Sequence, residues 1–124
     1  MQNELLAVHK DLDVKVYAVW FNMFPGDSGD RWPSATLADS RVAHFWDEDR
    51  AVGDWYGARL AVMNDTLVPG SKGVEAPLWD AYLVYGPDAT WTEELRGLRR
   101  WGRTILLTRE ALRESIESLA AEQR

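Results

Sequence analysis

The sequence predicts an α/β fold, because segments with helical and strand-like spacing alternate along its 124 residues. The decisive segment is 14–21 (VKVYAVWF), whose β-branched and aromatic side chains favour a strand. Both of its alternating faces are apolar, and such strands are normally covered by other layers on both sides. The chain is 46% apolar and 27% charged, and its length fits one domain over residues 1–124.

The first half of the chain is predicted to contain two helices and two strands. The first helix is capped by Asn3 and ends near residues 11–13, before the strand at 14–21. A long loop then covers residues 22–40, and a short strand follows at 41–46. The loop contains a Pro-Gly turn at positions 25 and 26 and has room for a short helix at 34–38.

Asp47 is predicted to cap the second helix, because its carboxylate can accept free N–H groups at the helix start. Two glycines of this helix, Gly53 and Gly57, mark a face where another backbone can pack closely. The apolar stripe of the helix comprises Val52, Trp55, Tyr56, Leu60 and Met63.

The second half is predicted to begin with a buried strand at 78–85, after a loop with a Pro-Gly turn at 69 and 70. A turn at 86–89 leads to a short antiparallel strand at 90–92. Residues 93–124 contain a basic segment, a last strand or helix lead at 104–107, and a helix capped by Thr108. The buried stripe of that last helix comprises Ala111, Leu112, Ser115, Ile116 and Leu119.

Composition excludes several classes of function. The net charge of −6 argues against general binding to a nucleic-acid backbone. The absence of cysteine excludes disulfides, thiolate metal sites, thiol nucleophiles and dithiol redox chemistry. No signal-peptide core or membrane-spanning run is visible, so the expected location is the cytoplasm, without membrane contact. No cofactor is predicted.

Three stretches resemble a known group of proteins: 19–28 (VWFNMFPGDS), 39–47 (DSRVAHFWD) and 76–87 (APLWDAYLVYGP). Together, over residues 5–92, they resemble uncharacterised bacterial thioredoxin-like proteins. The resemblance implies a thioredoxin-like sheet of about four strands flanked by helices. This sequence departs from the group because it lacks the group's first strand and Cys-x-x-Cys motif. The redox activity is therefore not expected here, since disulfide exchange needs a thiolate.

The missing strand predicts a homodimer. In a thioredoxin-like sheet this strand lies between the two long ones, and without it an apolar strand would expose unpaired backbone groups. Either the sheet closes differently, or a second copy covers the open edge. The resemblance also implies a cis bond between Ala76 and Pro77, and a binding edge at these residues. The alternative is an ordinary trans proline at a strand entrance.

Several residues are candidates for metal binding or catalysis. His44, Asp47 and Asp49 have side chains that hard metals use, but helix capping explains the two aspartates better, so no metal site is predicted. Loop carboxylates with His44 or His9 could serve a hydrolase-like enzyme, although turn formation explains these loop residues much better. The loop candidates are Asp27, Asp30, Asp39, Ser28 and Ser34.

Four arginines around Trp101 form a candidate anion patch. Guanidinium groups suit carboxylates and phosphates, and an indole can stack on a cation or a base. The simpler interpretation is that they neutralise the acidic segment 26–54, within a subunit or across a dimer, so nucleic acid is not the expected partner. The patch comprises Arg96, Arg99, Arg100 and Arg103.

Seven tryptophans also suggest an apolar ligand pocket or a subunit interface. Trp32 and Trp46 are the candidates, together with His44, Ala76 and Pro77. The preferred function is a non-redox binding or assembly module, homodimeric, with a protein or small apolar ligand as partner. The alternatives are a small hydrolase-like or metal-dependent enzyme using His44, and a degenerate fragment that keeps its fold without activity.

Overall fold

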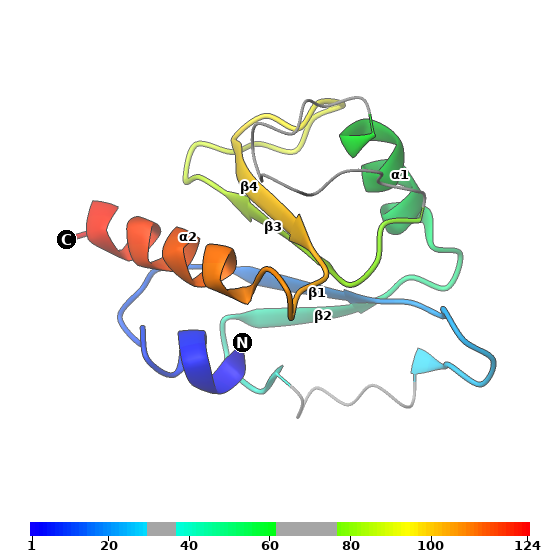
Figure 1. The fold of residues 1–124 in the computed structure, drawn as a ribbon, viewed down its shortest axis with the longest axis horizontal. Coiled ribbons are helices and arrows are strands. Elements are labelled where there is room, and N and C mark those ends of the chain that lie inside the picture. The colour runs from blue at the N-terminus through cyan, green and yellow to red at the C-terminus, as the bar shows by residue number, and fades with distance from the viewer. Residues whose placement is uncertain (30–36, 62–76) are drawn as a thin grey trace. The chain divides into compact units, whose positions relative to one another are not determined.

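The computed structural model describes residues 1–29, 37–61 and 77–124. It is a mixed α/β structure with two small sheets and helices, which confirms the predicted class. Its contacts group into two compact units, Met1–Val52 with Gln123 and Gly53–Glu122 with Arg124. The elements in chain order are η1 (Gln2–Leu6), β1 (Val16–Trp20), β2 (Val42–Trp46), α1 (Ala51–Leu60), β3 (Ala81–Tyr85), β4 (Leu98–Arg103) and α2 (Arg109–Glu122) (Figure 1).

In the first unit, β1 and β2 pair in parallel, with Val16 opposite Val42 and Trp20 opposite Trp46. Both lie inside the strands predicted from sequence. The predicted first helix is shorter than expected: η1 is a single π-helical stretch, and turns follow it through residue 11. Three leucines of this N-terminal segment, Leu5, Leu6 and Leu12, are nevertheless buried.

The Pro-Gly turn in the first loop is confirmed. The N–H of Asp27 donates to the carbonyl of Phe24 at 3.1 Å, and Gly26 has a φ of 90°. Proline at the second position and a left-handed glycine at the third are the requirements of a type II turn. The Asp27 carboxylate also accepts the N–H groups of Met23 and Phe24, at 2.9 and 2.8 Å. The short helix predicted at 34–38 lies mostly outside the described residues.

In the second unit, β3 and β4 pair antiparallel, with Ala81 opposite Arg103 and Leu83 opposite Trp101. The predicted partner strand at 90–92 is wrong, because the partner of β3 is Leu98–Arg103 and residues 90–92 lie in the connecting loop. That loop is closed at its base by a bond from the N–H of Gly86 to the carbonyl of Gly97, at 2.9 Å. Residues 104–107 form a turn rather than a strand.

Helices cover both faces of the β3–β4 sheet. On one face, Tyr56 and Leu60 of α1 form a core cluster with Leu78 and Trp101, against which Ala81, Leu83 and Tyr85 pack. On the other face, the buried side chain of Val84 lines a surface pocket with Leu119 of α2. The strand at 14–21, which the sequence predicts to be covered on both sides, is not, since Tyr17 of β1 is 65% exposed. The strand predicted to be buried at 78–85 contains β3, whose two faces are covered by α1 and α2. No helix within the described ranges is long and apolar enough to cross a membrane.

Of the two predicted helix caps, Asp47 accepts N–H groups at the start of α1, whereas Thr108 makes a different bond. The carboxylate of Asp47 accepts the N–H groups of Ala51 and Val52, at 3.0 and 2.8 Å, from four residues before the helix. Thr108 directly precedes α2, but its hydroxyl donates to the carbonyl of Thr104 at 2.8 Å. Gly53 and Gly57 lie on the buried face of α1, and the carbonyl of Gly53 accepts the N–H of Leu78 at 2.8 Å. Met63 and the turn at 69–70 lie outside the described residues.

Candidate functional site

His44 lies on β2 with both ring nitrogens in hydrogen bonds. Its Nδ1 accepts the indole N–H of Trp20 at 2.9 Å, and its Nε2 lies 2.9 Å from the carbonyl of Leu37. An indole nitrogen only donates and a carbonyl only accepts, so this pair of partners assigns the neutral Nε2–H tautomer. The imidazole and indole planes differ by 8°. His44 therefore holds Trp20 and Leu37 in place and has no free nitrogen to act as a base or ligand.

Trp46 ends β2 and packs against the preceding loop. A Cβ atom added at Gly29 would lie 3.2 Å from Cγ of the Trp46 ring, which is tighter than ordinary van der Waals contact. This glycine lets the loop backbone approach the indole closely. Trp46 is partly buried, and it is not among the residues that line the surface pocket formed by β3, β4 and α2.

The remaining candidates from the resemblance are only partly described. Pro77 is partly buried and directly precedes Leu78, whose side chain belongs to the core of the second unit. Ala76 lies outside the described residues, and with it the Ala76–Pro77 bond. Trp32 lies outside them too, as do Asp30 and Ser34.

The described carboxylates of the first loop serve the backbone. Asp27 closes the turn at 23–27, Asp39 pairs with Arg41, and Asp47 caps α1. Among the residues that the structure describes, no three His, Asp or Glu side chains converge on a position for a metal ion. The arrangement therefore stabilises turns and helix ends.

Arg41 is the residue that the sequence interpretation missed. Its guanidinium donates to the carbonyls of Leu6 at 2.6 Å, His9 at 2.7 Å and Leu12 at 3.1 Å. The Asp39 carboxylate holds it from the other side through Nε and Nη2, at 2.9 and 2.7 Å. These bonds from Arg41, with its backbone N–H, lower the pKa of Asp39 from 3.8 to about 2. This Arg41 clamp satisfies the backbone where the N-terminal helical segment ends.

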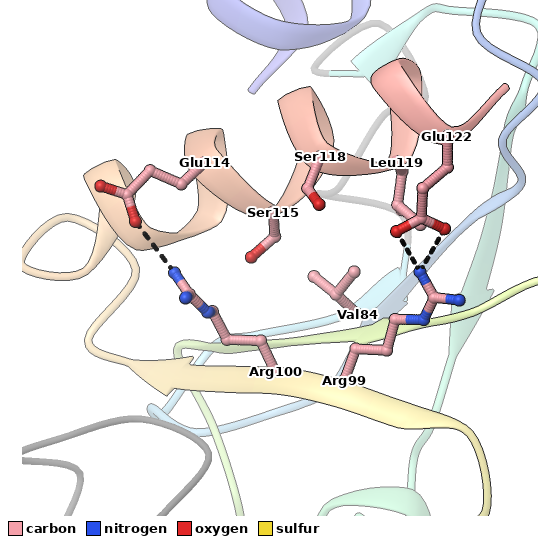
Figure 2. Close-up of a pocket in the computed structure, with 8 residues that line it drawn as sticks. All are labelled: Val84, Arg99, Arg100, Glu114, Ser115, Ser118, Leu119 and Glu122. Atoms are coloured by element: carbon pink, nitrogen blue, oxygen red, sulfur yellow. Dashed lines mark hydrogen bonds and ion pairs between the residues drawn. The ribbon is translucent and has the colours of Figure 1, made fainter. Parts of the chain in front are cut away.

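Two arginines of the candidate anion patch, Arg99 and Arg100, are brought together by a β-bulge. Val84 pairs with Arg100 and Tyr85 with Leu98, so Arg99 is an extra residue in β4. A bulge of this kind can turn two adjacent side chains to the same face of a strand. Arg99 and Arg100 accordingly both line the surface pocket between β4 and α2 (Figure 2).

Glutamates of the same unit neutralise three arginines of this patch. Arg99 donates to both carboxylate oxygens of Glu122 at 2.8 and 2.7 Å, and Arg100 to Glu114 at 3.1 Å, across the pocket in Figure 2. Arg96 pairs with Glu94 at 2.9 Å. The compensating carboxylates therefore come from 94, 114 and 122 rather than from segment 26–54. Arg103 has no partner among the described residues.

Two exposed aromatic surfaces were not predicted as such. Tyr17 and Phe45 lie on the β1–β2 sheet with ring centroids 6.2 Å apart, and Trp91 lies in the β3–β4 loop beside Trp55 and Tyr56. The apolar spacing of these residues gave a signal for strands and helices. The spacing does not show which of these side chains are exposed, because aromatic side chains of the same kind are also common in protein cores.

Comparison with known proteins gives no match to a protein-family model, to a curated protein or to a solved structure.

Proposed function

We propose that this chain is a non-redox, thioredoxin-like binding and assembly module that works as a homodimer. The order of helices and strands supports a thioredoxin-like interpretation, and the absence of cysteine is consistent with a role other than thiol exchange. The described strands hydrogen-bond as two separate two-stranded sheets. Separate pairs are what remains when a thioredoxin-like sheet loses the strand between its two long ones.

The observation that carries the proposal is the exposed face of the β1–β2 pair. In the parallel register, Tyr17 and Val19 share one face with Ala43 and Phe45. The Tyr17 and Phe45 side chains are 65% and 52% exposed. Parallel sheets occur almost only where both faces are covered, and an aromatic pair on an open face marks an interaction surface.

A second copy of the chain is the proposed cover for this face. Two strands alone are marginally stable, and pairing or packing against a further layer stabilises such a sheet. Most soluble oligomers are symmetric homodimers, in which the same patch faces itself. Two Tyr17–Phe45 faces across a two-fold axis would bury each other's rings.

The enzyme alternative has less support. His44 already uses both ring nitrogens, and the described loop carboxylates bind backbone N–H groups or Arg41. A general base needs a nitrogen or oxygen free to reach the proton it removes.

Sedimentation velocity tests the proposal. We expect the wild-type chain to sediment at twice its mass of 14.1 kDa, and the double variant Tyr17→Glu/Phe45→Glu to sediment as a folded monomer. Val8→Glu is the matched control, since Val8 is also 65% exposed but lies outside the sheet. A wild-type monomer at micromolar concentration, or a dimer that both glutamates leave intact, would contradict the proposal.

A further inference from the structure

The strand β1 uses only some of its backbone groups to pair with β2. The two strands run in a continuous parallel register. At one end of β1, the N–H of Val16 donates to the carbonyl of Arg41 at 3.0 Å, and at the other end the carbonyl of Trp20 accepts the N–H of Asp47 at 2.7 Å. In a parallel pair, every second residue of a strand bonds to the same neighbouring strand. The first, third and fifth residues of β1 therefore bond to β2.

The second and fourth residues, Tyr17 and Val19, form an outer edge of β1 whose backbone groups point away from β2. Their N–H and C=O groups have no hydrogen-bond partner in the part of the chain that the structure describes. Such unpaired groups are a template for pairing with another strand. Proteins that avoid this pairing often place a proline, a charge or a bulge in the edge strand, and β1 (VYAVW) contains none of these. The outer edge of β1 is therefore suited to an added strand.

Side chains beside this edge specify what kind of strand fits. Tyr17 and Val19 on one face of β1, and Val16 and Ala18 on the other, offer apolar surface to a neighbouring strand. β-Branched side chains pack well in such positions. Lys15, directly before β1, is exposed and has no ion-pair partner among the described residues. An opposite charge directly across a strand pair is stabilising, so the fitting strand carries an acidic residue beside this lysine.

We propose that the outer edge of β1 binds an extended, β-branched peptide segment of another protein, with an acidic residue beside Lys15. The segment pairs with the free N–H and C=O groups of Tyr17 and Val19 and becomes a third strand of the sheet. In this mode of recognition, main-chain hydrogen bonds give the affinity and alternate side chains give the specificity. The inference rests on the homodimer proposed above, because a second copy on the Tyr17–Phe45 face leaves this edge open.

Fluorescence anisotropy with a labelled peptide of alternating valine and threonine that ends in glutamate tests the inference. We expect saturable binding to the wild-type chain and about tenfold weaker binding to Val19→Pro, the scale of one lost hydrogen bond. This proline removes an N–H that β2 does not use, so the variant should fold and sediment as the wild type does. Val19→Ala is the matched control, because it keeps the N–H and should bind within about threefold of the wild type.

Methylation of the peptide nitrogens tests the same bonds in the wild-type chain, so the result does not depend on the folding of a variant. The fully N-methylated peptide should not bind, and glutamine in place of its glutamate should weaken binding and reduce its dependence on salt. Equal affinity for the methylated and unmethylated peptides would overturn the inference. A Val19→Pro variant that sediments as a folded monomer would overturn it too, since that result would assign the edge to contact between copies. Absence of peptide binding to a wild-type chain that sediments as a dimer would overturn this inference alone and leave the homodimer intact.

Discussion

At the scale of single residues, the polar side chains that suggested chemistry are used for architecture. His44 joins an indole N–H to a loop carbonyl, and Asp27 and Asp47 accept N–H groups at a turn and at a helix start. Buried or partly buried backbone groups must find partners, and short polar side chains near them supply those partners. Sequence patterns show which residue types are present but not which backbone groups they reach. This is why the Arg41 clamp, which spans more than thirty residues to Leu6, could not be predicted.

Replacing Arg41 by lysine should destabilise the first unit. A lysine ammonium has one nitrogen and cannot reproduce the fork that reaches Leu6, His9 and Leu12 while Asp39 binds its other edge. We expect the free energy of unfolding to fall by about 2 kcal/mol, the scale of hydrogen bonds from a charged group. Urea unfolding followed by circular dichroism measures the change. Arg109→Lys is the control and should be neutral, because Arg109 is exposed and has no partner among the described residues.

The pKa of Asp39 makes the same contact sensitive to acid. Its folded-state pKa is about 2 against 3.8 for the free group, so its ionised form favours folding. That stabilisation is complete above pH 3.8 and is lost as the pH falls towards 2. The stability difference between wild type and Asp39→Asn should therefore be constant from neutral pH down to about pH 4 and shrink below it. A difference that stays constant down to pH 2 would show that the carboxylate charge is not involved.

At the scale of elements, the sequence was informative wherever apolar spacing decides the structure. β1, β2, α1 and α2 lie at the predicted positions, and the buried residues of α2 are Leu112, Ile116 and Leu119 of its predicted stripe. The antiparallel partner of β3 was misplaced for a physical reason. The sequence of β4 is LRRWGR, and its three arginines and one glycine are not residues that favour strands. The bulge at Arg99 also interrupts the alternation of apolar and polar side chains by which a strand is predicted.

Asp47 should contribute measurably to α1. Its carboxylate satisfies two of the N–H groups that have no partner inside the helix, those of Ala51 and Val52. We expect Asp47→Ala to lower the free energy of unfolding by about 1 kcal/mol. Asp49→Ala is a matched control in the same turn, because Asp49 is exposed and makes no such bond, and it should change stability by less than about 0.5 kcal/mol. Equal effects in thermal unfolding would assign the contribution to helix-end electrostatics instead.

At the scale of the whole molecule, the two units differ in how their sheets are covered. Tyr82 and Val84 of β3 and Trp101 of β4 are buried, whereas no residue of β1 or β2 reaches full burial. The sequence pattern could not reveal this difference, because 14–21 is at least as apolar as 78–85. Apolar content measures the tendency of a strand to be covered, and it does not show which layer covers the strand.

Hydrogen exchange should report that layer directly. Amides of β3 and β4, between two helices, should exchange slowly at every protein concentration, because their protection comes from within one chain. The proposed homodimer predicts that amides of β1 and β2 exchange faster in dilute solution and become protected as the protein concentration rises, as mass action requires. In Tyr17→Glu/Phe45→Glu the concentration dependence should vanish while β3 and β4 stay protected. Protection of β1 that is strong and independent of concentration in the wild type would mean that the same chain already covers this face, and the homodimer would then have no role in it.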